Sequence, residues 1–174
     1  MKNSSFDFVV NYFGYADVME STRWLTDSEQ TAWRAYLDST RLLQRVLDQQ
    51  LVHDSDISFT DFELLVALAE APGRQLRMSE LADAVMATRS GVTRAVNRLV
   101  GVGWVRRVEC VDDKRGANAE LTDQGAEKLA SASPAHVAAV RKNMFDLLSP
   151  RDVERLGVVF GEMRRHLWAG QSGN

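Results

Sequence analysis

The chain has 174 residues, which suits one domain or one domain with a helical extension. Apolar residues make up 45% and charged residues 26%, as in an ordinary globular protein, and the net charge is −3. The single cysteine excludes an internal disulfide framework, and no apolar run approaches the roughly 20 residues that cross a bilayer. We therefore expect a cytoplasmic protein with no membrane segment.

Residues 1–24 form an N-terminal extension of uncertain structure. Its aromatic residues fit neither strand nor helix periodicity, and it lacks the basic leader and small-residue cleavage site of a signal peptide. Two interpretations stay open: an extra helix that packs on a partner subunit, or a native start at Met19.

A capping box, Thr26 to Glu29, predicts the start of a long helix that runs to about Val52. Its apolar side chains spread over an arc of roughly 220°, whereas one core requires a stripe of about 100°. We expect this helix to contact both its own domain and another subunit.

A second capping box, Thr60 to Glu63, predicts the next helix, which Pro72 and Gly73 end. We expect its inward face to hold Phe62, Leu65, Val66 and Ala69. Residues 75–78 are a candidate edge strand.

Residues 78–122 hold two short helices followed by a basic ribbon. Ser79 is the expected N-cap of a helix that ends at Met86, and Thr88 of a helix over 89–103. At 100° per residue, the second helix buries an aliphatic face and turns polar residues outward. The buried face comprises Val92, Ala95, Val96, Leu99 and Gly103, and the outward face Ser90, Arg94, Asn97 and Gly101.

Residues 104–111 and 117–121 are β-like and flank a charged turn, which predicts a hairpin. Helix, turn, helix and hairpin is the order of a winged helix-turn-helix, in which the second helix enters a major groove. Residues 88–116 carry seven basic and three acidic side chains, hence +4 in a chain of −3. This asymmetry is typical of a surface that meets phosphates.

Thr122 is the expected cap of a helix that Pro134 interrupts or bends. Ser149 and Pro150 predict a restart, with a last helix to about Trp168 whose one face holds Leu156, Val159, Phe160, Met163 and Leu167. We expect the first and last helices to pack together across a twofold axis, the alternative being an all-α monomer with these helices folded back.

The predicted fold class is therefore mainly α with a small β-wing (α+β). A winged helix-turn-helix core over 56–125 lies between dimerisation helices over 25–55 and 126–170.

Several motifs together resemble the multiple-antibiotic-resistance regulator (MarR) family of prokaryotic transcription factors, over about residues 25–168. They are Phe59-Thr-Asp-Phe-Glu-Leu-Leu65, Ser79-Glu-Leu-Ala82, Val92-Thr-Arg94, Arg98-Leu99, Gly103-Trp-Val-Arg106, Asp113-Lys-Arg115 and Leu121-Thr-Asp-Gln-Gly125. The resemblance implies a homodimer that binds a pseudo-palindromic operator in double-stranded DNA and usually represses a nearby gene. A departure is Val100-Gly-Val102, where many relatives carry charged residues.

The resemblance also implies that Arg115 enters the minor groove, that Asp113 orients the wing by an ion pair, and that the second helix reads the major groove. The predicted DNA contacts are Thr88, Arg89, Ser90, Thr93, Arg94, Asn97, Arg98, Arg107, Asp113, Lys114 and Arg115. Arg94 and Asn97 suit either bases or phosphates, and Arg98 suits a phosphate or an intramolecular carboxylate. Of Arg106 and Arg107, which alternate across a strand, we expect at most one to face DNA.

Relatives often bind small phenolic or other aromatic anions and then release DNA. The candidate lining residues for such a ligand are Trp33, Tyr36, Phe62 and His136, with plain core packing as the alternative.

We predict no enzymatic activity, because the chain has no phosphate loop, nucleophile elbow or His-Glu metal helix. No cofactor is expected, and the three histidines lack metal-ligand spacing. Cys110 in the wing is interpreted as a bystander. The competing function is a winged-helix protein-interaction module that does not read DNA.

Overall fold

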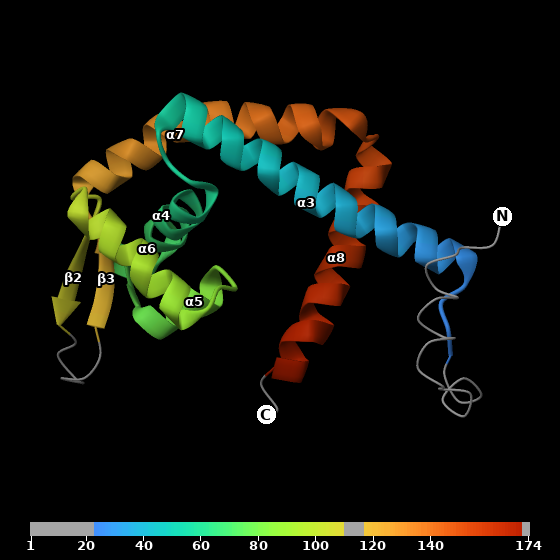
Figure 1. Cartoon of the computed structure of the whole chain (residues 1–174), viewed down its shortest axis with the longest axis horizontal. Helices are drawn as coiled ribbons and strands as arrows, with labels where there is room; N and C mark the ends of the chain where they lie inside the picture. Colours follow the sequence, from blue (N-terminus) through green and yellow to red (C-terminus); the bar gives the residue numbers. More distant parts are fainter. Residues whose placement is uncertain (1–22, 110–116, 172–174) are drawn as a thin grey trace, which may run out of the picture. The chain divides into compact units, whose positions relative to one another are not determined.

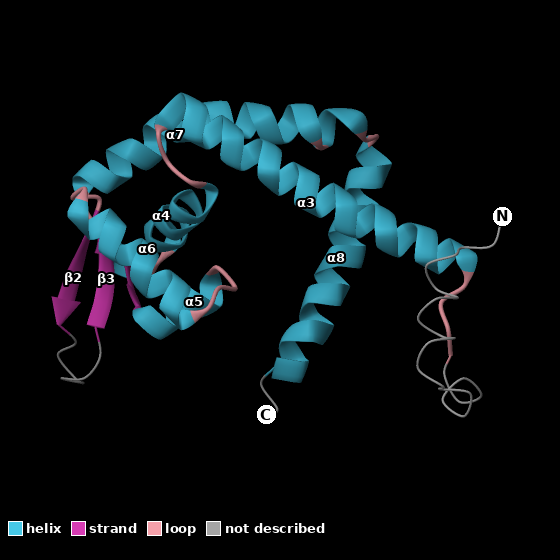
Figure 2. Ribbon diagram, viewed as in Figure 1, coloured by secondary structure: helices cyan, strands magenta, loops and turns pink. Residues whose placement is uncertain are grey.

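The computed structural model describes residues 23–109 and 117–171. The chain divides into two compact units, residues 1–40 and 41–174. The described residues are mostly helical with one small sheet, as Figure 2 shows, which confirms the predicted mainly α class.

The first unit contains the start of helix α3 (Asp27–Ser55), which continues into the second unit. The predicted capping box is present: the Glu29 amide donates to Thr26 Oγ1 over 3.3 Å, and the Thr26 amide donates to the Glu29 carboxylate over 2.8 Å. These two bonds satisfy amides that the first turn leaves without partners, and so they set where α3 begins.

The second unit holds the winged core. It comprises α4 (Phe59–Glu70), a 3₁₀ turn (Pro72–Arg74), β1 (Gln75–Arg77), α5 (Met78–Ala84), α6 (Arg89–Gly101), β2 (Val105–Glu109) and β3 (Ala117–Leu121). The sheet is antiparallel in the order β1-β3-β2, so β1 is the predicted edge strand. Figure 1 shows β2 and β3 side by side near the helices of the core.

One apolar core joins these elements. Leu64, Leu65 and Leu68 from α4 are fully buried, and they belong to the same cluster as Leu81 of α5 and the buried face of α6. That face consists of Val92, Ala95, Val96 and Leu99, as its periodicity predicted. Burying large aliphatic side chains stabilises a fold by about 1.5–3 kcal/mol each, so this cluster holds α6 in place.

Two predicted helix caps were wrong. The N-cap of α4 is Ser58, whose hydroxyl accepts from the Asp61 amide over 3.1 Å, and Thr60 lies inside the first turn. Ser79 likewise lies inside α5, where the Glu80 carboxylate accepts from the Arg77 amide over 3.0 Å. In both helices the backbone amide at the helix start is bound by a side chain other than the predicted one.

Two helix ends and one inward position also differ from prediction. Helix α5 ends at Ala84, because Met86 has a left-handed φ of 50° that a helix does not accommodate. Helix α6 ends at Gly101, and Gly103 adopts a φ of 78° just beyond it. Ala69 of α4 is exposed rather than inward.

Two glycines allow α6, the sheet and the next helix to meet. At Gly103, the Gly103 and Trp104 amides donate to carbonyls of the last turn of α6 over 3.1 and 3.0 Å, which ends the helix in a Schellman motif. At Gly125, a Cβ atom would lie 2.1 Å from the Trp104 carbonyl oxygen. No side chain fits there, so the chain approaches β2 closely only because residue 125 is glycine.

Helix α7 (Asp123–Asn143) begins at the predicted cap, where Thr122 Oγ1 accepts from the Gly125 amide over 3.0 Å. Pro134 does not interrupt it, contrary to one of our two expectations. The proline removes a single backbone hydrogen bond. Ala132, two residues earlier, is fully buried in the core, and this packing keeps the helix in place.

A 3₁₀ turn (Phe145–Leu147) leads to α8 (Pro150–Gln171). The restart is confirmed, because Ser149 Oγ accepts from the Asp152 amide over 3.3 Å and Pro150 is the first helical residue. The predicted apolar face of α8 is largely exposed: Val159, Met163 and Leu167 are 55%, 39% and 57% accessible.

Candidate nucleic-acid interface

The start of α6 is held by its cap. Thr88 Oγ1 accepts from the Gly91 amide over 3.2 Å, and a Cβ at position 91 would lie only 3.0 Å from that oxygen. Thr93 Oγ1 donates to the Arg89 carbonyl over 2.8 Å, which keeps that hydroxyl close to the helix. The first turn is therefore fixed by its own side chains, and it exposes the short polar residues Thr88, Ser90 and Thr93, types that suit phosphate oxygens and base edges.

The outward face of α6 is polar and exposed at Ser90, Arg94 and Asn97, as predicted. The Arg89 and Arg94 side chains form no hydrogen bond or ion pair with another residue in the described part of the chain. An exposed guanidinium without a carboxylate partner keeps its full charge for an anion outside the protein. These two arginines are therefore the clearest candidates on α6 for contact with DNA.

Arg98 differs from these two because its charge is compensated. Its guanidinium lies 2.8 Å from the Asp61 carboxylate on α4, and the Asp61 side chain is only 14% exposed. This is the intramolecular carboxylate that we left open as one of two partners. The ion pair connects α6 to the start of α4, so Arg98 helps to position α6.

Arg106 and Arg107 have different partners, as their alternation along the strand predicts. Arg106 forms two bonds with the Glu120 carboxylate, of 3.0 and 2.6 Å, across the β2–β3 ladder. The hydrogen bond and charge of Glu120 raise the pKa of Arg106, so its charge is permanent but balanced.

Arg107 is exposed and donates to the side-chain oxygen of Asn97 on α6 over 2.9 Å. Asn97 is neutral, so this bond connects the hairpin to α6 and does not compensate the charge of Arg107, which forms no ion pair with another residue of the described ranges. Arg107 is thus the member of the pair that remains available to DNA. The same bond occupies one acceptor of Asn97, which keeps its amide donors for other partners.

Four residues of the predicted wing lie outside the described residues: Cys110, Asp113, Lys114 and Arg115. Their roles stay predictions from the sequence and the resemblance.

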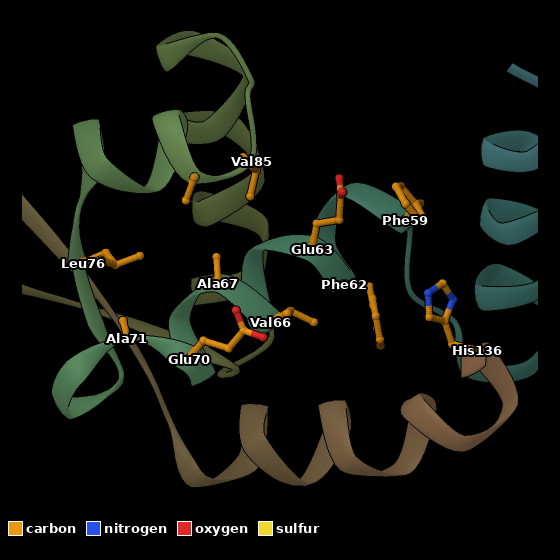
Figure 3. A pocket seen from close by; sticks show the side chains of 11 residues that line it. Phe59, Phe62, Glu63, Val66, Ala67, Glu70, Ala71, Leu76, Val85 and His136 are labelled. Atoms are coloured by element: carbon orange, nitrogen blue, oxygen red, sulfur yellow. The ribbon is translucent and has the colours of Figure 1, made fainter. Parts of the chain in front are cut away.

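The predicted ligand residues fall in different units. Trp33 and Tyr36 lie in the first unit, one helical turn apart with ring centroids 6.0 Å apart. Phe62 and His136 lie in the second unit, where their rings are 4.6 Å apart and line an open cavity of about 470 Å³ (Figure 3). This volume lies within the range of ligand pockets, about 300–1,000 Å³.

Two other features of the described residues are relevant to function. No group of three or more His, Cys, Asp or Glu side chains is arranged to hold a metal ion within them. None of their helices combines the length and apolar character needed to cross a bilayer.

The sequence reasoning missed the residues that hold the interface together. Asp61, Glu120 and Lys128 have partners far along the chain, and Lys128 both lies 5.0 Å from the Trp104 ring centroid and donates to the Ser55 carbonyl. Of these three residues, only Asp61 lay in a motif that the sequence singled out, the capping box that was wrongly assigned to Thr60.

An α-helical core with a helix-turn-helix, a three-stranded sheet and a polar recognition helix defines a winged helix-turn-helix protein. A sequence model described as the MarR family matches residues 55–116. The regulator PecS of Dickeya dadantii (strain 3937), an HTH-type transcriptional regulator, is 30% identical over 131 residues, which cover 72% of this chain and 75% of PecS.

Two solved structures from Streptomyces coelicolor are also similar. AbsC, a MarR family transcriptional regulator, is 40% identical with a TM-score of 0.79 over 85% of this chain and 99% of AbsC. Sco3205, a MarR family transcriptional regulator solved in complex with DNA, is 46% identical with a TM-score of 0.79 over 83% of this chain and 94% of Sco3205. The chain belongs to the MarR family of transcriptional regulators.

Proposed function

We propose that the protein is a homodimeric repressor that binds a pseudo-palindromic operator near its own gene. The observation that carries this proposal is the exposed face of α6, where Arg89 and Arg94 have no carboxylate partner among the described residues. Arg107, which bonds to Asn97, adds a third charge beside that face that no carboxylate of the described residues compensates. The solved complex of the similar regulator Sco3205 with DNA supports the same use of the fold here.

The proposed dimer explains the apolar surface of α8. None of the side chains described over residues 150–170 of this helix is buried, and Val158, Val159, Leu167 and Trp168 are 61%, 55%, 57% and 47% exposed. Exposed apolar area of this extent marks an interaction surface, and a second copy of the chain supplies a matching one under twofold symmetry. We assign dimerisation to the helices within residues 25–55 and 126–170, and DNA reading to residues 56–125.

The dimer would place two recognition helices about 34–36 Å apart, one turn of the duplex. We also propose that a small aromatic ligand releases the DNA. Such a ligand acts only by binding one spacing of the two helices better than the other. The cavity at Phe62 and His136 is our candidate site. A role of Trp33 and Tyr36 in ligand binding stays a prediction from the sequence.

A titration of a fluorescent duplex from the region upstream of the gene tests the proposal. Fluorescence anisotropy at several salt concentrations should show affinity that falls steeply with salt, because each neutralised phosphate contributes a log–log slope of about −0.9. The absence of binding at low salt would instead favour a protein-interaction module.

A further inference from the structure

The charge of the cavity beside Phe62 indicates what kind of effector fits it. Glu63, Val66, Ala67 and Glu70 recur at the spacing of one face of α4 and line the cavity together, as Figure 3 shows. The lining is formed entirely by described residues and contains no lysine or arginine. The apolar floor of the cavity therefore carries two carboxylates and no permanent positive charge.

Glu63 is the more buried of the two carboxylates. Its side chain forms no ion pair or hydrogen bond with another described residue, and burial raises its pKa. A carboxylate that has lost part of its hydration and gained no partner is destabilising when charged. A cation bound beside it would supply the missing partner.

The third polar group of the lining, His136, does not offset this negative charge. Burial lowers the pKa of its imidazole, so the ring is neutral near pH 7. Its Nδ1 atom is buried and has no hydrogen-bond partner among the described residues. The ring centroid lies 4.6 Å from that of Phe62 and 6.1 Å from that of Phe59, so these aromatic side chains form one part of the same cavity lining.

We propose that this cavity binds a small aromatic amine in its ammonium form, with the ring against Phe59 and Phe62 and the charged nitrogen at Glu63. Aromatic faces attract cations, and a ring on the ligand adds apolar burial. An aromatic anion, the effector class that the family resemblance implied, would face Glu63 and Glu70 with no basic side chain to balance its charge. The inference rests on the proposed function in taking this cavity as the effector site.

Calorimetry of the full-length protein with three matched probes tests the inference. Phenethylammonium, phenylacetate and phenethyl alcohol share a phenyl ring and differ in charge near pH 7. We expect the ammonium ion to bind at least about tenfold more tightly than the other two, a difference of about 1.4 kcal/mol. Equal or tighter binding of phenylacetate, or no heat with the ammonium ion at millimolar concentration, would overturn the inference.

A pair of variants then locates the charge. Glu63→Gln keeps the shape of the side chain and should weaken phenethylammonium binding about tenfold, whereas Glu127→Gln, on an exposed position of α7, should leave it unchanged. An unaltered affinity in Glu63→Gln would remove Glu63 from the site. The probe comparison on the unaltered protein stands even where this variant folds poorly.

Anisotropy with the upstream duplex on the same preparation separates this inference from the proposed function. Normal DNA binding with no preference for the ammonium ion refutes only the ligand class. If the unaltered protein does not bind the duplex at all, the proposed function is refuted.

Discussion

Replacing Arg94 by alanine should weaken operator binding without destabilising the fold. Its guanidinium is exposed and has no partner in the described chain, so the folded protein loses no internal contact. A dimer loses two such groups at once. If each neutralises one phosphate, the log–log salt slope becomes shallower by about 1.8.

This change in slope is large enough to measure. Because the slope is shallower by about 1.8, raising the salt from 50 to 200 mM should weaken operator binding by the variant roughly tenfold less than binding by the unaltered protein. If Arg94 instead contacts a base edge, the salt slope changes little. In that case one base substitution in the operator, which costs the unaltered protein about 1–3 kcal/mol of binding free energy, no longer weakens binding by the variant. Anisotropy titrations with the operator and single-base variants at both salt concentrations distinguish the two contacts.

The matched control is Arg98→Ala, on the same helix. Its guanidinium is paired with Asp61 at 2.8 Å, so its loss should lower the free energy of unfolding by about 1 kcal/mol in urea denaturation. Its effect on the salt slope should be smaller than that of Arg94→Ala. An Arg94→Ala protein that binds the operator with unchanged affinity and slope would refute the reasoning that uncompensated arginines on α6 contact DNA.

Four further variants test other parts of the account. Arg115→Ala should weaken operator binding strongly while sedimentation still shows a dimer, and unchanged affinity would remove the wing from the mechanism. Gly125→Ala should lower the free energy of unfolding by about 1–3 kcal/mol, because its Cβ would lie 2.1 Å from the Trp104 carbonyl oxygen. Gly157→Ala on α8 has open space and should raise that free energy by about 0.5–1 kcal/mol, so equal effects of the two variants would contradict the packing argument. The pKa of His136 is lowered in the folded state, so the unfolded chain takes up the proton first and stability should fall as pH drops through 6.5. His136→Gln should lack this component in urea denaturation across pH, and an identical pH profile would show that the imidazole is not buried.

Periodicity and local capping carried most of the fold prediction. The buried face of α6, the cap at Thr88 and the restart at Ser149 depend on residues within a few positions of each other, and the structure confirms them. The wrong caps have the same local origin, because Ser58 and Thr60 both precede an acidic residue by a helical spacing. Only the backbone conformation decides which hydroxyl reaches the free amide.

The distribution of charge on the interface could not be predicted in the same way. Residues 88–116 contain seven basic side chains, but the partners of Arg98 and Arg106 come from positions 61 and 120. Such pairs depend on tertiary packing, so composition alone treats compensated and uncompensated arginines alike. The carboxylates that line the cavity were missed for the same reason, since Glu63 was interpreted only as part of a helix cap.

The central claim is that two copies of this chain bind one duplex through paired recognition helices. Sedimentation equilibrium of the protein with a fluorescent duplex from upstream of its gene tests this claim most directly. The account predicts a dimer of the free protein and a complex with two chains per duplex that dissociates as salt rises. A free monomer at micromolar concentration, or a duplex that sediments unchanged at low salt, would contradict it.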